Sequence, residues 1–467
     1  MRQSQDFIPD AVLDTLFKRL PQAVLEDRLQ AAQALARIRG FRYLDDRGRA
    51  RSIDLSIRPW LLTSTQLRFF SDAIRLLAGA LHQVAALYRA RADVRSILRV
   101  SEEQAEWLKL QPISSDGPLG VMGRMDSTAS FGHSGWQRDF RMLEPNAVGV
   151  GGVHYAPVGC RIVLDVVDDL LRRALPGLRV APTADPRQML LGELTLVARK
   201  IGTPLRRIAL IENTDYTTGT DEFGGLARYF QDIGLDAVVA DPRALQLRNG
   251  RILAQGKPID LLYRDSELGE FIEMEQKGKL LKATRAAVRQ GRLISSLIWE
   301  LDQKSAWEIF TDERFARFFS PMHRRFFRSH LLWTRLLSDR QVTDSRGRSV
   351  DLLPFVRKNR AKLVIKPNSL FGGEGVVIGC ETAQRVWERE IDQALRGKED
   401  YVVQELARIS RESIAHFDGG RAVVHPRSTV SGFFFTSGGV GLVGRFSGRT
   451  VVNVSQGGGL IPALWVR

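Results

Sequence analysis

Two pairs of polar residues in the first third of the chain have the types and spacing that metal binding requires. Arg124 and Asp126 stand two positions apart, and so do Glu144 and Asn146. Residues i and i+2 of an extended strand face the same side, so a hairpin of these segments would present all four side chains on one face. Mg²⁺ is held by carboxylate and amide oxygens, so this face is a candidate magnesium site. A solvated hairpin with unrelated charges is the alternative that spacing leaves open.

A lysine and a glycine-rich loop in the last third suggest phosphate binding. The segment AKLVIKPNSLFGGEGVVIG reads as a strand with Lys366, a glycine-rich loop and a second strand; the loop contains Gly372, Gly373, Glu374 and Gly375. It is no P-loop, because no lysine follows the glycines, and it is no dinucleotide fingerprint, because VVIG continues as strand. We predict a mobile glycine hairpin that closes over a nucleotide, with Lys366 adding positive charge.

The elements that must position these residues change in type along the chain. Apolar residues recur at helical spacing near the N-terminus, and alternating strands and helices in the middle indicate a small parallel α/β unit. A ligand of such a unit lies at the strand ends, here near Asn213 and Arg264. The expected helical stretches are 11–39, 64–98, 161–175, 295–337 and 382–395, the expected metal-site strands are 121–127 and 140–144 with a glycine-rich turn between them, and the parallel unit is 207–264.

The composition limits the function classes. A chain of 467 residues, 44% hydrophobic and 26% charged, is an ordinary globular protein with room for two or three domains. The net charge of +15 comes from arginines spread along the chain, which makes nucleic acid an unlikely partner and suits an anionic substrate. Two cysteines, Cys160 and Cys380, provide no disulfide framework. Without a signal peptide or a sufficiently long apolar helix, we expect a cytoplasmic protein with no membrane partner.

Several weaker signals leave alternatives open. Gly439, Gly441 and Gly444 fit a dinucleotide pattern, but the strand-like sequence that follows favours a β-turn. Arg445 and Asn453 either line a nucleotide site or are ordinary strand residues, and the loop 455–459 either contacts phosphate or is a terminal loop. The seven histidines show no paired spacing, so zinc is not indicated.

The ordered set of motifs resembles the circularly permuted ATP-grasp family, which includes glutathionylspermidine synthase. The motifs are RMD ending at Asp126, EPN ending at Asn146, Asp302-x-Lys304, IKP ending at Pro367, FGGEG, VVQE ending at Glu405, and VVNVSQGGG. The metal-binding strands precede the lysine and the flap, which is the permuted order. The resemblance extends from about residue 120 to the C-terminus and is closer to an uncharacterised branch than to glutathionylspermidine synthase itself.

The resemblance implies a role for each matching residue. Asp126, Glu144 and Asn146 match magnesium ligands, and Arg124 matches the arginine that stabilises charge on the transferring phosphoryl group. The positions that match the nucleotide site are Lys304, Lys366, the flap residues Gly372, Gly373, Glu374 and Gly375, and the hinge residues Gln404, Glu405 and Leu406, which meet adenine and ribose.

The resemblance further implies an ATP- and Mg²⁺-dependent ligase that joins a carboxylate to an amine through an acyl phosphate and releases ADP. Its partners would be a small-molecule or peptide carboxylate and an amine acceptor, with Arg264, Glu267, Asp221 and the loop after Asn213 as candidate contacts. The competing hypothesis is a nucleotide-binding scaffold or regulator without activity. The oligomeric state and both substrates are not indicated.

The implied fold is mixed α/β (α+β), a circularly permuted ATP-grasp with four parts. We expect a helical N-terminal region (1–105), a first ATP-grasp segment with the metal-binding strands (106–185), a small parallel α/β substrate domain of the pre-ATP-grasp type (186–300), and a second ATP-grasp segment with the lysine, flap and hinge (301–467).

Overall fold

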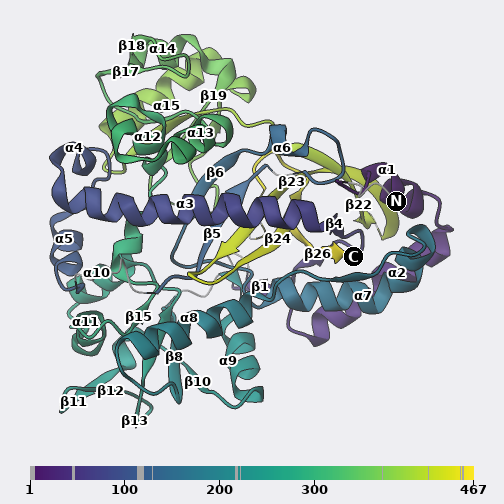
Figure 1. Cartoon of the computed structure of the whole chain (residues 1–467), viewed down its shortest axis with the longest axis horizontal. Helices are drawn as coiled ribbons and strands as arrows, with labels where there is room; N and C mark the ends of the chain where they lie inside the picture. Colours follow the sequence, from purple (N-terminus) through teal and green to yellow (C-terminus); the bar gives the residue numbers. More distant parts are fainter. Residues whose placement is uncertain are drawn as a thin grey trace.

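The structure is a computed structural model with mixed α/β architecture. It describes residues 6–44, 48–112, 120–128, 130–215, 219–220, 222–370, 372–418, 420–452, 454 and 457–467. In Figure 1 the long helix α3 (Ser64–Ala90) crosses the molecule, with the green lobe on one side of it and the teal lobe on the other. Among the described residues, no helix combines the length and apolar character needed to cross a bilayer.

The largest sheet joins the early part of the chain to the late part. Its strands, in spatial order, are β3 (Asp54–Leu55), β25 (Gly459–Ile461), β24 (Val440–Ser447), β23 (Arg421–Phe435), β5 (Gly123–Ser127) and β6 (Met142–Asn146), with β22 (Ser410–Asp418) paired to β23. Asp126 on β5 lies opposite Gly432 on β23, about three hundred positions later in the chain. Residues distant in the sequence therefore share one face of this sheet.

Helix α3 covers one face of the large sheet because its apolar positions follow helical spacing. Phe70, Ile74, Leu77 and Leu81 are buried, and the ring of Phe70 stacks on that of Phe433 with centroids 4.9 Å apart. A capping box begins the helix: the Thr63 side chain accepts the N–H of Gln66, whose side chain accepts the N–H of Thr63.

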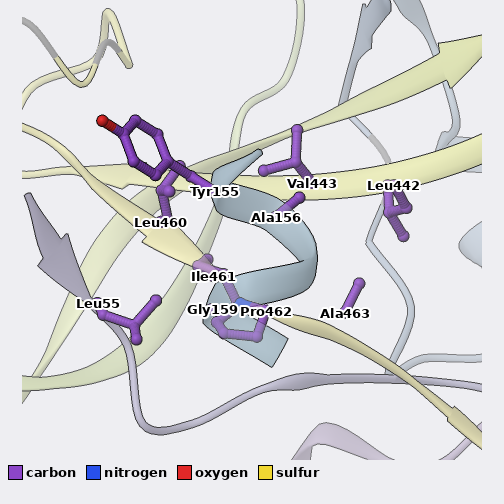
Figure 2. A pocket seen from close by; sticks show the side chains of 10 residues that line it. All are labelled: Leu55, Tyr155, Ala156, Gly159, Leu442, Val443, Leu460, Ile461, Pro462 and Ala463. Atoms are coloured by element: carbon purple, nitrogen blue, oxygen red, sulfur yellow. The ribbon is translucent and has the colours of Figure 1, made fainter. Parts of the chain in front are cut away.

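The opposite face packs against helix α7 (Tyr155–Ala174). Figure 2 shows the contact, where Tyr155 and small residues of α7 meet aliphatic side chains of β3, β24 and β25. A Cβ atom on Gly159 would lie 3.2 Å from Leu55 Cδ1, so the helix approaches closely here. This seam has no room for a water molecule, so it belongs to the core.

The green lobe contains a small antiparallel sheet. Its strands are β16 (Thr334–Leu336), β21 (Tyr401–Glu405), β19 (Leu363–Pro367) and β20 (Val377–Ile378), and its other elements are β17 (Gln341–Thr343), β18 (Ser349–Asp351), α14 (Leu352–Lys358) and α15 (Gln384–Arg396). Val364 pairs with Ile378 and Ile365 with Val377, which confirms the predicted strand, glycine loop and second strand. Gly372, Gly373 and Gly375 all have positive φ, a conformation that L side chains rarely adopt.

The teal lobe contains the predicted parallel α/β unit. Its sheet consists of β10 (Asp236–Ala240), β8 (Arg207–Ile211), β14 (Leu261–Arg264) and β15 (Leu293–Ile294). The accompanying elements are α8 (Pro186–Lys200), α9 (Glu222–Asp232), α10 (Leu268–Gln276), α11 (Lys282–Arg289) and the strands β11 (Gln246–Arg248), β12 (Arg251–Ala254) and β13 (Lys257–Pro258). The carboxyl ends of its parallel strands meet at one edge, beside Asp265.

The N-terminal region is helical but is tied to the rest of the chain by short strands. Its helices are α1 (Asp10–Lys18), α2 (Gln22–Ile38), α3, α4 (Ala92–Arg95) and α5 (Glu102–Leu108). The strands are β1 (Arg42–Leu44), which pairs with β2 (Ala50–Ser52) and β9 (Gly219–Thr220), and β4 (Trp60–Leu62), which pairs with β26 (Ala463–Val466), itself next to β7 (Val180–Pro182). The domain limits at 105, 185 and 300 stay a prediction.

Two expectations about secondary structure were right only in part. The helical stretch expected over 295–337 consists of short pieces and ends in a strand: 3₁₀ helices Leu297–Leu301 and Glu313–Phe318, α12 (Ala306–Thr311), α13 (Pro321–His330) and strand β16. Asp312 and Ser320 each accept a backbone N–H as N-caps and restart the helix, which explains the breaks. The connection between β5 and β6 contains the short helix α6 (Trp136–Asp139), and the second strand spans Met142–Asn146.

Candidate functional site

Strands β5 and β6 bring the four predicted polar residues to one face. In their antiparallel register Asp126 lies opposite Glu144, and Arg124 lies opposite Asn146. A β-bulge follows Asp126, where Met142 becomes the partner of Ser127. Because a bulge changes which side a residue faces, Met142 is fully buried while Glu144, two positions later, is partly exposed.

Asp126 is held by two arginines from different ends of the chain. Arg124 Nε donates to Asp126 Oδ1 at 2.8 Å, and Arg445 Nη2 on β24 lies 2.8 Å from Asp126 Oδ2. Burial by itself would raise the pKa of Asp126, but the two guanidinium groups outweigh it and lower the pKa to about 2. Arg124 Nη1 also donates to the carbonyl of Gly151 at 2.7 Å, so three contacts fix its position.

A glycine on the strand between the two arginines makes this arrangement possible. A Cβ atom on Gly432 would lie 2.6 Å from Cδ of Arg124 and 3.1 Å from its Nε. The Arg124 side chain therefore lies directly over β23, in space that any larger residue would occupy.

Glu144 faces two lysines from the second half of the chain. Lys366 Nζ donates to Glu144 Oε2 at 3.2 Å, and Lys304 Nζ is 3.9 Å from the same oxygen. Burial raises the pKa of Glu144, but both ammonium groups outweigh it, so the net shift is downward. Burial lowers the pKa of Lys366 in spite of Glu144. We call Arg124, Asp126, Glu144, Lys304, Lys366 and Arg445 the charged cluster.

Asn368 positions Lys304 beside Lys366. The Asn368 carbonyl accepts the N–H of Lys304, its Oδ1 accepts the N–H of Ser305 at 2.8 Å, and its Nδ2 donates to Gln303 Oε1. Asn368 follows β19 by one residue and is 1% exposed. Lys304 Nζ donates to the carbonyl of Leu370 at 2.6 Å, so the lysine is also held by the chain that leads into the glycine loop.

The glycine loop is close to a second loop that follows β24 in the large sheet. A Cβ atom on Gly373 would lie 2.5 Å from Cγ1 of Val451, and the Thr450 hydroxyl donates to Glu381 at 2.7 Å. Glu374 is exposed. The loop thus bridges the small and large sheets, next to the strand that carries Lys366.

The three hinge residues are engaged within the structure. Gln404 is buried, and its Nε2 donates to the Leu143 carbonyl and to Thr334 Oγ1, which fastens the small sheet to β6. The N–H of Glu405 donates to Trp333 and that of Leu406 to Lys362. Both N–H groups are already bonded to carbonyls, so adenine would have to bind other groups of this segment. The hinge role stays a prediction.

Carboxylates accumulate where the parallel sheet meets β6. This acidic edge consists of Asp265, Glu267, Glu270, Glu300 and Asp302. The carboxylate of Asp302 accepts the N–H of Ala147, directly after Asn146, which places the acidic edge beside the metal-site strands. Burial raises the pKa of Asp302 to about 7 and that of Asp265 to about 6, and burial with nearby carboxylates raises that of Glu267.

The expectations for substrate contacts fare differently. Arg264 has no exposed surface: it donates to the carbonyls of Ser295 and Ser266 and pairs with Glu300. It is a structural anchor, which corrects the expected substrate contact. Glu267 lies at the acidic edge and forms a capping box with Glu270. Asp221 and Asn453 lie outside the described residues, as do Ser455 and Gln456 of the terminal loop.

The donor atoms of the predicted metal ligands suit Mg²⁺. Two carboxylates and one amide come from directly paired strands, and facing Cβ atoms in such pairs are about 5 Å apart. Among the described residues no group of three or more histidine, cysteine, aspartate or glutamate side chains is arranged for a metal. Mg²⁺ ordinarily keeps waters and shares substrate phosphates, so a partial shell fits it.

Three residues that position the charged cluster were not found from the sequence patterns. Gly432 in SGFFF carried a usable signal, since a lone glycine within a strand marks a close approach. Asn368 and Glu222 carried none. Glu222, at the start of α9, accepts the N–H groups of Gly152 and His154 in the turn that holds Arg124, and burial raises its pKa to about 7.

Comparison with known proteins shows the fold. No protein-family model matches the chain, and no curated protein matches it. A solved structure of a glutathione synthetase-like effector from Globodera pallida, in its apo form, is similar with a TM-score of 0.63 and 12% identity, over 98% of this chain and 99% of that one. A protein assigned as a gamma-glutamylcysteine synthetase from Methylobacillus flagellatus matches with a TM-score of 0.35 and 12% identity, over 80% and 82% of the chains. The first match shows that the fold is of the glutathione synthetase-like type.

Proposed function

We propose that this protein is an ATP- and Mg²⁺-dependent ligase of the circularly permuted ATP-grasp type, which joins a carboxylate to an amine and releases ADP and phosphate. One observation carries the proposal: four distant segments place Arg124, Arg445, Lys304 and Lys366 around Asp126 and Glu144, between two sheets and beside a glycine loop. Four cations against two carboxylates leave an excess of positive charge, which suits a triphosphate. The glutathione synthetase-like fold supports the same reading.

In this proposal the cations of the charged cluster bind and orient the phosphates. A carboxylate oxygen of the substrate attacks the γ-phosphorus, ADP leaves, and an acyl phosphate forms. Lys366 and Lys304 neutralise phosphate oxygens, while Arg124 and Arg445 stabilise the charge on the transferring phosphoryl group. Bound Mg²⁺, held by Asp126, Glu144 and Asn146, would supply further neutralisation of that charge. The glycine loop excludes water, which would otherwise hydrolyse the acyl phosphate.

The acidic edge is the proposed side of the acceptor amine. An amine reaches the protein as a cation and must lose a proton before its nitrogen attacks the acyl carbon and displaces phosphate. Asp302, with a pKa near 7 and one oxygen on the Ala147 N–H, is the proposed acceptor of that proton at Oδ1. Asp265, whose pKa of about 6 leaves it mostly ionised at neutral pH, would attract the cationic acceptor to the same place.

One observation favours a second candidate, a nucleotide-binding regulator without activity. Both oxygens of Asp126 are already engaged by guanidinium groups, so a magnesium ion must compete with Arg124 and Arg445 for them. A triphosphate would draw these arginines away and release the carboxylate; a regulator would keep them paired.

The test measures ADP formation with ATP and Mg²⁺ in the presence of pooled carboxylates, pooled amines, or both. ATP binding is measured separately by calorimetry. We expect ADP formation only with both pools, and a fall of about 10²–10³-fold in Glu144→Gln, which retains the shape and removes the charge. Glu102→Gln, an exposed glutamate on α5, is the matched control and should behave as the wild type.

The results separate the two candidates. ATP binding that needs Mg²⁺ without ADP formation for any pooled combination supports the regulator. Failure of the wild-type protein to bind ATP would sink both.

A further inference from the structure

An open pocket lies away from the charged cluster, between the N-terminal region and the teal lobe. Its volume is about 470 Å³, within the range typical of small-molecule sites. The lining comes from the end of α2, the start of β1, the first turns of α7 and α8, and one face of α9.

Arginine dominates the lining of this pocket. Five of its twelve lining residues are arginines, namely Arg37, Arg39, Arg42, Arg187 and Arg228, with Asp232 as the single carboxylate. In the whole chain lysine and arginine together are 68 of 467 residues, so the enrichment is local and is not a consequence of the overall charge. No lysine contributes, which matters because the planar guanidinium binds carboxylate or phosphate through two parallel hydrogen bonds.

The walls of the pocket are held in place before any ligand binds. Arg187 Nη2 donates to Asp185 at 2.7 Å, and its guanidinium stacks on the Tyr229 ring at 4.0 Å. Arg39 pairs with Asp165 at 3.1 Å. Asp185 contacts Arg187 through Nε and Nη2, and Asp165 contacts Arg39 through Nη2.

Two arginines in the pocket carry charge that the described residues leave uncompensated. Arg37 and Arg228 are exposed, and neither guanidinium has an ion-pair partner in the described part of the chain. The helix dipole favours a cation in the last turn of a helix, which accounts for the position of Arg37 in α2. It does not account for Arg187, which lies in the first turn of α8, where a cation is disfavoured. Such a set is typical of an anion site.

His154 also lines the pocket, and its ring packs on α9. A Cβ atom on Gly225 would lie 2.5 Å from Nε2 of His154, so only glycine permits this contact. His154 belongs to the same turn as Gly151, whose carbonyl holds Arg124. The pocket is thus joined to the charged cluster by one short turn.

We propose that this pocket binds a small polyanion with at least two carboxylate or phosphate groups, gripped by Arg37 and Arg228 between the fixed walls of Arg39 and Arg187. This proposal stands independently of ligase activity, because it concerns binding alone. A tricarboxylate and a pyrophosphate share the required chemistry, and titration with each identifies which group the pocket prefers.

The experiment titrates the full chain with citrate, with pyrophosphate and with acetate as a monovalent control, by calorimetry at low and at moderate salt, without ATP. We expect saturable binding of at least one polyanion, at least tenfold weaker in the double variant Arg37→Ala/Arg228→Ala. Asp232→Asn should tighten binding about two- to threefold, since it removes the one opposing charge. The control double variant Arg248→Ala/Arg289→Ala removes two exposed arginines elsewhere in the chain. Its net charge therefore equals that of the pocket double variant.

Three results would overturn the proposal: no saturable binding of either polyanion, equal weakening in both double variants, or weaker binding in Asp232→Asn. ATP binding serves as a folding check, because both double variants should retain it if the charged cluster binds nucleotide. If the wild-type protein fails to bind ATP but binds a polyanion as described, the pocket stands and the proposed ligase function falls.

Discussion

The charged cluster and the acidic edge are neighbours with opposite electrostatics. In the charged cluster, Asp126 is buried between two arginines and its pKa falls to about 2. At the acidic edge, Asp302 accepts the Ala147 N–H, and burial together with Glu300 outweighs Lys304 and Arg264 and raises its pKa to about 7. Two aspartates on adjoining elements therefore differ because of their partners, not because of their depth.

This contrast suits a reaction between an anion and a cation. Phosphates require positive charge around them, and an acceptor amine requires negative charge and a group that accepts a proton. The positive site and the acidic edge both adjoin β6 and the segment after it. In this arrangement the two reactants would bind next to each other, each at its own site. Each of the following predictions tests one side of the contrast.

The largest effect is expected from Lys366→Met. The change removes a positive charge and retains the length of the side chain, so Glu144 keeps only Lys304, at 3.9 Å. We expect ADP formation to fall about 10²–10³-fold and ATP binding to weaken. Lys362→Met, which alters an exposed lysine four positions earlier, is the control. Equal activity of the two variants would show that the charged cluster does not bind phosphates.

A smaller effect is expected from Gly432→Ala, which leaves every charge in place. The new Cβ would lie 2.6 Å from Arg124 Cδ, so the arginine must move away from Asp126. We expect the turnover number to fall about 10- to 100-fold and the free energy of unfolding to fall by about 1–3 kcal/mol. Gly438→Ala, where nothing lies within 4 Å, is the matched control. A fully active Gly432→Ala variant would show that catalysis does not depend on the position of Arg124.

The smallest effect concerns pH. Because the folded-state pKa of Asp302 is about 7 against an ordinary 3.8, the folded protein binds more protons between these values. The free energy of unfolding therefore falls as pH rises through this range. Asp302→Asn should remove up to about 1.4 kcal/mol per pH unit from that slope, measured by urea unfolding at several pH values. Parallel curves for variant and wild type would contradict the raised pKa.

Local pattern was sufficient for some elements and insufficient for others. The i and i+2 spacing of Arg124 with Asp126 predicted one shared face, and the glycine run before VVIG predicted the strand and loop, because both depend on a few adjacent residues. The helical stretch expected over 295–337 is broken into short pieces because Asp312 and Ser320 act as N-caps, and capping competes with apolar periodicity. Arg264 was misjudged because its type gives no sign of burial.

The sequence by itself determined which chemical groups are present and in what local order: the paired polar residues, the lysine before the glycines, and the strand and helix periods that carry them. Only the tertiary structure decided that Arg445 on β24 reaches Asp126 on β5, that Asn368 sets Lys304 beside Lys366, and that arginines from four elements line one pocket. Periodicity and turn chemistry act over a few residues, whereas ion pairs, pKa shifts and cavities depend on distances between segments that strand pairing brings together.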